Sequence, residues 1–326
     1  MVSTRAAKRS RTESEDAEPE NTTRVAYTPS TDFWFEDGNI IIVAGNTGYR
    51  VHSSMLARHS SVFRDMLKLP PSDDEELEGN CPVVPLFDNA GDLERILSVF
   101  YDNIKDYDRN APIPFAYIAA MLRLGKKYEI DHLLKEGMKH IRAMYPSSLS
   151  LWKSSSTRIQ IDNQTIVQAI NLAHELQLCR TLPTMYLSFI RRRGLAGLLA
   201  PHNELLNPVA VRRMMIGREK LILLLHKEHR SLKERLSVIM INVCTNLAKC
   251  MNHHVVAFES LGLWTTDAGR TTYLKRWANL NQPLCASCIK EFRTMFDGVR
   301  EKVWKELPQL FTLGTWEDLR DDIEVA

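Results

Sequence analysis

The sequence lacks a long hydrophobic run. None of its apolar stretches reaches the roughly 18 residues that a membrane-spanning helix needs; Leu221–Leu225 and Val238–Ile241 have the length of buried core segments. The charged N-terminus is not followed by an apolar stretch, so we expect no secretory signal. These absences predict a soluble protein without a membrane partner.

Cysteine and net charge are also scarce. Six cysteines, unevenly spaced in 326 residues, favour a reduced intracellular compartment, the nucleus or the cytoplasm, over a disulfide framework. A formal net charge of +2 gives no general attraction for nucleic acid. The basic clusters Arg191–Arg193 and Arg212–Arg213 lack interleaved aromatic residues for stacking on bases, and arginines before Gly194 suit a solvated helix C-terminus. Nucleic acid is therefore not an expected partner.

Motifs of catalysis are missing as well. The sequence contains neither a glycine-rich phosphate loop nor a His-Glu-x-x-His pair,. His52, Ser53 and Ser54 place a base beside hydroxyls, but catalysis also needs an orienting acid and an oxyanion site. The two serines are explained as helix caps, and we expect His52 to be a partly buried histidine bonded to nearby backbone. We expect no catalytic residue, no cofactor and no small-molecule substrate.

One set of residues resembles a zinc site in composition. Cys244, Cys250, Cys285 and Cys288, with His253 and His254 nearby, supply the thiolates and imidazoles that a tetrahedral zinc ion prefers,. However, Cys244 and Cys250 are six residues apart rather than two to four,. Cys285 and Cys288 also continue an apolar stripe in which cysteine acts as a small hydrophobic residue. Core packing is the favoured interpretation, so we predict no metal, with zinc as the alternative.

The stretch from Phe33 to Leu67 carries the strongest structural signal that is present. Asn39–Val43 is a β-branched run, Asn46–Gly48 supplies turn residues, and Tyr49–Val51 starts a second extended run, which together predict a β-hairpin,. From Ser53 the period becomes helical. The apolar positions of this helix are Met55, Leu56, His59, Val62, Phe63 and Met66.

Further elements follow in order up to Pro146. An acidic loop over 73–78 precedes a short strand over Val83–Phe87, with Pro85 at an edge or strand end,. A helix with the stripe Leu93, Ile96, Leu97 and Phe100 comes next,. A pair of helices over 117–128 and 130–141 completes the series.

This series resembles a BTB/POZ domain, in the form common in fungal proteins. The resemblance covers 32–145 and rests on Asp37–Ile41, Tyr49–His52, Leu56–Ser60, Val62–Met66 and Leu122–Leu133. It implies an α+β fold, with a small β-sheet flanked by helices, and a domain that binds proteins and often itself. The C-terminal tail, with Cys285, Cys288, Trp304, Leu307-Pro308 and Trp316, also resembles fungal BTB proteins.

The resemblance implies an interaction surface on the first helix and the hairpin. A helix with two apolar ridges has more apolar width than one buried face requires; the alternative is that the helix is enclosed within its own domain. Residues 1–31 show no amphipathic period, which disfavours the dimer with exchanged N-terminal segments known in animal BTB proteins. The predicted interaction residues are Asn39, Arg50, Met55, Leu56, His59, Val62, Phe63 and Met66.

Three regions are predicted in all: a disordered tail over 1–31, the BTB/POZ domain over 32–145, and a mostly α-helical region over 146–326. The first is polar, with too few apolar residues to offset the entropy of ordering. In the last, Leu182-Pro183 and Asn207-Pro208 begin helices, a helix over 285–307 ends before Pro308, and Thr315–Asp318 forms a capped turn,.

The leading functional hypothesis is a non-enzymatic protein-interaction module, with protein partners that include a second copy of the chain. One alternative is a substrate adaptor for a cullin-type ubiquitin ligase; cullin-binding members carry an apolar residue two positions before a glutamate, where this chain has Asp73, Asp74 and Glu76. The other alternative is a metal-dependent nucleic-acid-binding regulator. Cullin co-purification or zinc stoichiometry with salt-dependent DNA binding would distinguish them.

Overall fold

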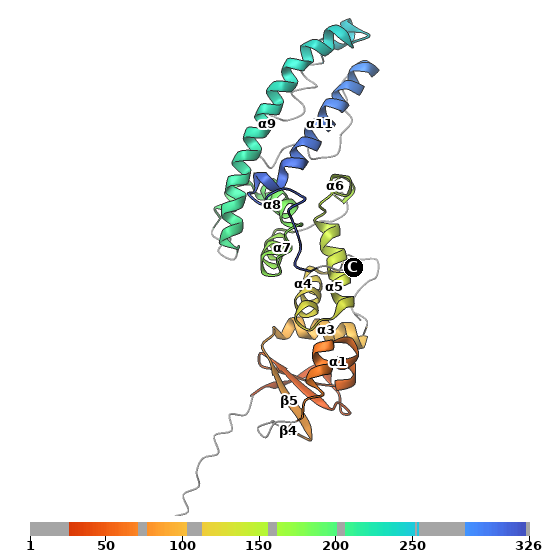
Figure 1. Cartoon of the computed structure of the whole chain (residues 1–326), viewed down its shortest axis with the longest axis vertical. Coiled ribbons are helices and arrows are strands. Elements are labelled where there is room, and N and C mark those ends of the chain that lie inside the picture. The colour runs from red at the N-terminus through yellow and green to blue at the C-terminus, as the bar shows by residue number, and fades with distance from the viewer. Residues whose placement is uncertain are drawn as a thin grey trace, which may run out of the picture. The chain divides into compact units, whose positions relative to one another are not determined.

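The computed structural model describes residues 26–70, 77–102, 113–155, 162–200, 206–251, 253 and 284–323. The chain divides into two compact units, one formed by 1–52 and 71–87 and the other by 53–70 and 88–326. Within the described residues, the first unit contains the strands and the second contains the helices (Figure 1). We call them the sheet unit and the helical unit.

The sheet unit holds five strands in the order β1-β3-β2-β5-β4. β2 and β3 form the predicted antiparallel hairpin, in register from Ile40 opposite Val51 to Ala44 opposite Thr47. The turn falls at Gly45 and Asn46 rather than at the predicted Asn46–Gly48, because Gly45 adopts a φ of 55° without steric cost and Thr47 and Gly48 already pair in β3,. β2 also pairs with β5 in parallel, so it is central and all five of its residues are buried. The strands are β1 (Thr28–Trp34), β2 (Ile40–Ala44), β3 (Thr47–Val51), β4 (Leu77–Glu78) and β5 (Cys81–Leu86).

Two boundaries in this unit differ from the prediction. β1 begins at Thr28, inside the tail predicted over 1–31, and pairs in parallel with β3. It is an edge strand with only Ser30 and Phe33 buried, so it lacks the alternating pattern that marks a half-buried strand,. β5 ends at Leu86, and the next side chain, Phe87, is 98% exposed. Of the acidic loop predicted over 73–78, residues 73–76 lie outside the described residues, and Leu77–Glu78 form the short strand β4 by pairing with β5.

The first helices of the helical unit follow the predicted order. The helix expected from Met55 to Met66 is interrupted at Ser60, where the Ser60 hydroxyl accepts a hydrogen bond from the Phe63 amide at 3.0 Å and donates one to the Tyr128 carbonyl at 2.6 Å. The buried Ser60 hydroxyl thus has both a donor and an acceptor partner, and as N-cap residue it begins a new helix,. The elements are α1 (Ser53–His59), α2 (Ser61–Met66), α3 (Ala90–Asp102), α4 (Phe115–Lys127) and α5 (Asp131–Met144).

The remainder is helical in its described parts, as predicted. The Asn207 side chain caps α9 by accepting from the Val209 amide at 2.9 Å, and Thr315 and Asp318 exchange hydrogen bonds in the predicted capped turn. Pro308 does not stop the last helix, which continues to Leu310. The elements are α6 (Leu149–Ser155), α7 (Asn163–Glu175), α8 (Leu182–Leu198), α9 (Pro208–Asn242) and α11 (Ala286–Leu310).

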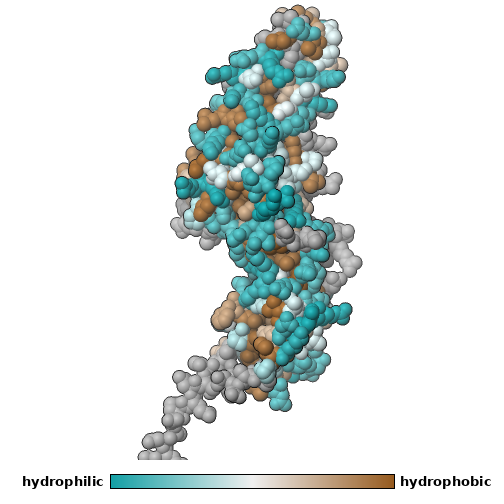
Figure 2. Space-filling view, viewed as in Figure 1, coloured by the Kyte–Doolittle hydropathy of each residue, from teal (hydrophilic) through white to brown (hydrophobic). Residues whose placement is uncertain are grey.

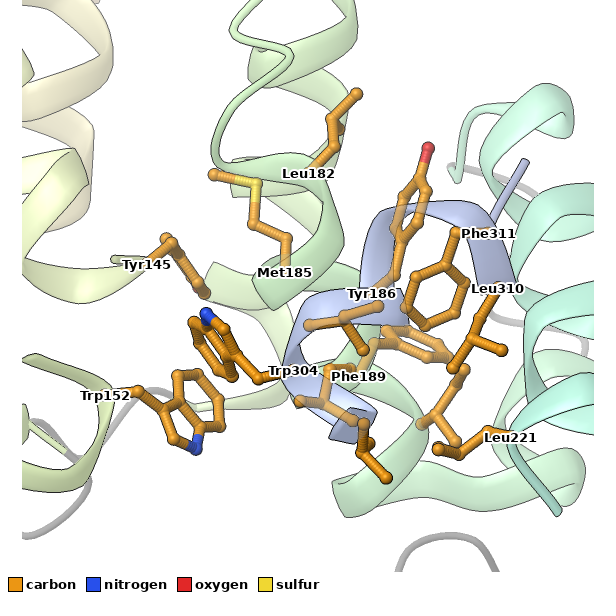
Figure 3. Close-up of a cluster of buried hydrophobic side chains, with 14 of the residues drawn as sticks. Tyr145, Trp152, Leu182, Met185, Tyr186, Phe189, Leu221, Trp304, Leu310 and Phe311 are labelled. Atoms are coloured by element: carbon orange, nitrogen blue, oxygen red, sulfur yellow. The ribbon is translucent and has the colours of Figure 1, made fainter. Parts of the chain in front are cut away.

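One hydrophobic core extends through the helical unit. It joins side chains of α4 and α5 to those of α7, α8, α9 and α11, so the core continues across residues 145 and 146. Figure 3 shows part of it, including Trp152 beside Trp304, whose ring centroids are 5.8 Å apart. The core residues labelled there are Tyr145, Trp152, Leu182, Met185, Tyr186, Phe189, Leu221, Trp304, Leu310 and Phe311.

Polar contacts also link α4 and α5 to later segments. Arg123 lies between Asp92 of α3, at 3.1 Å, and Glu175 of α7, at 2.9 Å. Arg142 of α5 pairs with Asp321 at 3.2 Å. Because these contacts supplement the shared core, the C-terminal region supports the helices of the predicted BTB/POZ domain.

None of the helices within the described ranges is both long and apolar enough to cross a membrane. The face drawn in Figure 2 is largely hydrophilic, with hydrophobic residues in separate patches.

Candidate functional site

The predicted interaction surface has an inner ridge that is enclosed by its own unit. Leu56 is 1% exposed and Phe63 is 3% exposed. The Phe63 ring stacks on Tyr128 with centroids 4.5 Å apart and planes 17° apart. Both side chains therefore belong to the core and are removed from the predicted surface, which is the alternative that the sequence left open for this helix.

The outer ridge of the same helices stays accessible. Met55, His59, Val62 and Met66 are only partly buried; these four residues are called the outer stripe. Met55 and His59 lie four positions apart on α1, and Val62 and Met66 lie four positions apart on α2, the spacing that places each pair on one side of its own helix. The stripe presents two thioethers and a branched aliphatic side chain, so it offers apolar contact rather than reactive chemistry.

His59 extends the outer stripe toward two residues that the sequence prediction omitted. Its ring stacks on Phe100 at 4.4 Å with planes 9° apart, and lies 5.0 Å from the His132 ring. Burial lowers the pKa of both histidines, so they are neutral at pH 7,. Phe100 was predicted only as part of a helix stripe, and no local pattern connects it with His59.

The other two predicted residues belong to the sheet unit. Asn39 is exposed, and its amide donates to the Val51 carbonyl at 3.0 Å. Arg50 is partly buried, and its Nε donates to the Gly38 carbonyl at 2.9 Å. Arg50 therefore holds the backbone at Gly38, just before β2 of the hairpin.

His52 is partly buried as predicted, but it has a carboxylate partner. Its Nε2 lies 3.2 Å from Asp37 Oδ2, and its ring packs near Phe35 at 5.4 Å. The hydrogen bond from His52 lowers the pKa of Asp37. Ser53, the neighbouring hydroxyl, is the first residue of α1.

Arg191, expected at a solvated helix end, is instead packed against an aromatic ring. α8 continues to Leu198 beyond a kink at Gly194, which has a φ of 57°. The Arg191 guanidinium lies 5.9 Å from the Trp152 ring centroid, and burial lowers the pKa of Arg191. The Arg191 side chain therefore packs over the Trp152 indole rather than extending into solvent,.

The structure brings together the four cysteines that resemble a zinc site in composition. The sulfur atoms of Cys244, Cys250, Cys285 and Cys288 all lie within 4.8 Å of one another; these four residues are called the cysteine cluster. Three are buried and Cys244 is partly buried. His253 is not part of this group, and His254 lies outside the described residues.

The cysteine cluster lies where α9 ends and α11 begins. Cys244 follows the end of α9, Cys250 lies on a short helical stretch over 247–251, and Cys285 is the N-cap residue of α11, with Cys288 one turn later. The Cys285 amide donates to Cys250 Sγ at 3.1 Å. Hydrogen bonds from the Thr245 hydroxyl and the Cys288 amide lower the pKa of Cys285 to about 5.

Comparison with known proteins identifies the N-terminal part of the chain. Residues 35–145 match the family model of the BTB/POZ domain. No curated protein and no solved structure matches the chain. The match spans β2 to α5 and agrees with the predicted α+β fold, a BTB domain followed by a mostly helical region. Residues 35–145 therefore form a BTB/POZ domain, a protein–protein interaction module.

Proposed function

We propose that this chain is a non-enzymatic interaction protein whose BTB/POZ domain joins two copies of the chain through the outer stripe. The observation that carries the proposal is the split between the two ridges of α1 and α2. Leu56 and Phe63 are buried in the core. Met55, Val62 and Met66 are only partly buried and keep apolar surface in contact with water.

The chemistry of the outer stripe suits protein contact. Methionine is flexible and polarisable, adapts to the shape of a partner, and is enriched at interfaces. Leu69, just beyond α2, is 71% exposed and adds to the apolar surface near the end of the helix. Neutral His59, stacked on Phe100, adds an aromatic surface without charge. Burying such residues together is favourable by roughly 25 cal/mol per Å² of apolar surface removed from water.

A second copy of the chain is the favoured partner. BTB/POZ domains self-associate in general, and a two-fold contact places the same residues of both copies opposite each other. An apolar stripe without charged members is compatible with that arrangement, because like charges would otherwise meet across the axis. The net charge of +2 also causes little repulsion between copies.

Light scattering on the full chain after size-exclusion chromatography tests this proposal. The expected mass is twice the 37.4 kDa of one chain. Val62→Asp and Met66→Asp, each of which places a charge in the interface, are expected to shift the equilibrium toward the single-chain mass. Leu223→Asp is a matched control, because Leu223 is 60% exposed on α9 and should leave the mass unchanged.

Two outcomes would refute self-association through this surface. The first is a single-chain mass for the unmodified protein at every concentration tested. The second is a mass that stays doubled in both stripe variants while circular dichroism shows them to be folded. The resemblance to fungal proteins and recruitment of a cullin remain predictions; a cullin that co-purifies with the single-chain variants would favour the adaptor role.

A further inference from the structure

We propose that Cys244, Cys250, Cys285 and Cys288 bind one zinc ion, which fastens the end of α9 to the start of α11. This inference is independent of the BTB/POZ domain and of self-association. It revises the sequence prediction that these cysteines only fill the core.

The separations of the sulfur atoms carry the proposal. A zinc–sulfur bond is about 2.3 Å long, so the ligands of a tetrahedral Cys₄ site lie about 3.8 Å apart. The four sulfurs lie within 4.8 Å of one another. Shifts of about 1 Å, within the reach of a χ1 adjustment, would bring all four to bonding distance of one ion.

The local structure explains why the spacing in the sequence was misleading. Cys244 precedes the short helical stretch over 247–251. Asn246 caps this stretch, because its side chain accepts a hydrogen bond from the Lys249 amide at 3.0 Å,. The helical turn brings Cys250 back toward Cys244, so two ligands six positions apart come as close as ligands two to four positions apart do in an open loop,. The Cys285-x-x-Cys288 pair has the usual spacing,.

The surroundings match a structural zinc site. Four protein ligands, three of them buried, leave no open position for a substrate,. Thiolates at the site are supported by N–H donors, among them the Cys285 amide on Cys250 Sγ at 3.1 Å,. Cys285 and Cys288 also occupy the first turn of α11, where the helix dipole favours negative charge,.

The position of the cluster suggests what the ion does. α9 and α11 lie side by side (Figure 1), and the cluster joins the last residues of one to the first residues of the other. Cys250 and Cys285 are 35 positions apart, so the ion would close a long connection. An ion that binds only the folded chain adds its binding free energy to the stability of this pair of helices.

Packing alone accounts less well for this arrangement. A buried cysteine is satisfied as a small hydrophobic residue beside any apolar neighbour. That role does not require four sulfurs from three segments to converge on one point. The two remaining cysteines, Cys81 and Cys179, lie outside the cluster and serve as internal controls.

The test is metal analysis of the full chain, expressed with zinc and purified without chelator. Elemental mass spectrometry should find about one zinc per chain, and iron or no metal would overturn the proposal. Cys285→Ser and Cys288→Ser should each lose most of that zinc, whereas Cys179→Ser should retain it. Cobalt exchanged into the unmodified protein should give the intense visible bands of tetrahedral thiolate coordination.

A second measurement keeps the proposal testable if the serine variants fail to fold. The unmodified chain, stripped of metal under reducing conditions, is treated with an alkylating reagent with and without added zinc. Peptide mass spectrometry should show zinc-dependent protection of the four cluster cysteines and unchanged alkylation of Cys179. Equal alkylation of the cluster with and without zinc would refute the site.

Discussion

Gly217 provides a sharp test of how α9 packs in the helical unit. It lies inside α9, where replacing glycine by alanine normally stabilises a helix by about 1 kcal/mol. A Cβ atom added at Gly217, however, would meet three ring atoms of Phe311 at 3.0 Å or less. Phe311 is 0% exposed, and an edge-to-face contact with Tyr186 at 5.3 Å limits its movement.

The steric term should therefore exceed the helix propensity. Overpacking a filled core costs about 1–3 kcal/mol, and the fixed ring favours the upper end of that range. We expect Gly217→Ala to lower the free energy of unfolding by about 2 kcal/mol once the gain in propensity is subtracted. Urea denaturation followed by circular dichroism at 222 nm, the helix band, measures the change.

A double-mutant cycle separates the two terms. Phe311→Ala alone should cost about 3–5 kcal/mol by opening a cavity. In that background the obstacle to a Cβ at Gly217 is gone, so Gly217→Ala should become stabilising by about 1 kcal/mol. Gly298→Ala on α11 is the matched control, because an added Cβ there meets no atom within 4 Å. A stabilising effect of Gly217→Ala in the unmodified chain, or the same cost in both backgrounds, would refute the reasoning.

Two further predictions concern charge in the helical unit. Asp321 is buried and accepts a hydrogen bond from Arg142 at 3.2 Å, so Asp321→Asn should lower the free energy of unfolding by about 1–3 kcal/mol; Asp322→Asn, at an exposed side chain, should change it by less than about 1 kcal/mol in the same urea titration. Burial lowers the pKa of His174, whose Nε2 lies 2.6 Å from the Tyr186 hydroxyl. The unfolded state therefore binds a proton more readily just below pH of about 6.5, and stability should fall as the pH drops through that range. His174→Asn should reduce this acid sensitivity in thermal melts, and an unchanged pH profile would contradict the assignment.

The two ridges of α1 and α2 show the limit of what periodicity predicts. Helical spacing identified both Leu56 with Phe63 and Met55 with Val62 as apolar, but it could not decide which ridge is covered. The ring of Tyr128, more than sixty residues away, covers Phe63,. The outer stripe was therefore distinguishable from the core only after folding.

Patterns that span only a few residues were sufficient to predict a hairpin, a helix cap and a capped turn. The β2–β3 hairpin, the Asn207 cap and the Thr315–Asp318 turn depend on neighbours in sequence, and all were predicted. β1 was missed because an exposed edge strand needs no alternating pattern,.

The sequence by itself thus determined most elements of residues 35–145, because hairpins, caps and amphipathic helices are set by local spacing, and their succession resembled the BTB/POZ domain that the family match shows. Only the tertiary structure decided that the core continues past residue 145 and that Cys244 and Cys250 meet Cys285 and Cys288. These contacts join residues far apart in the chain, and their partners are chosen by how whole helices pack rather than by any local pattern.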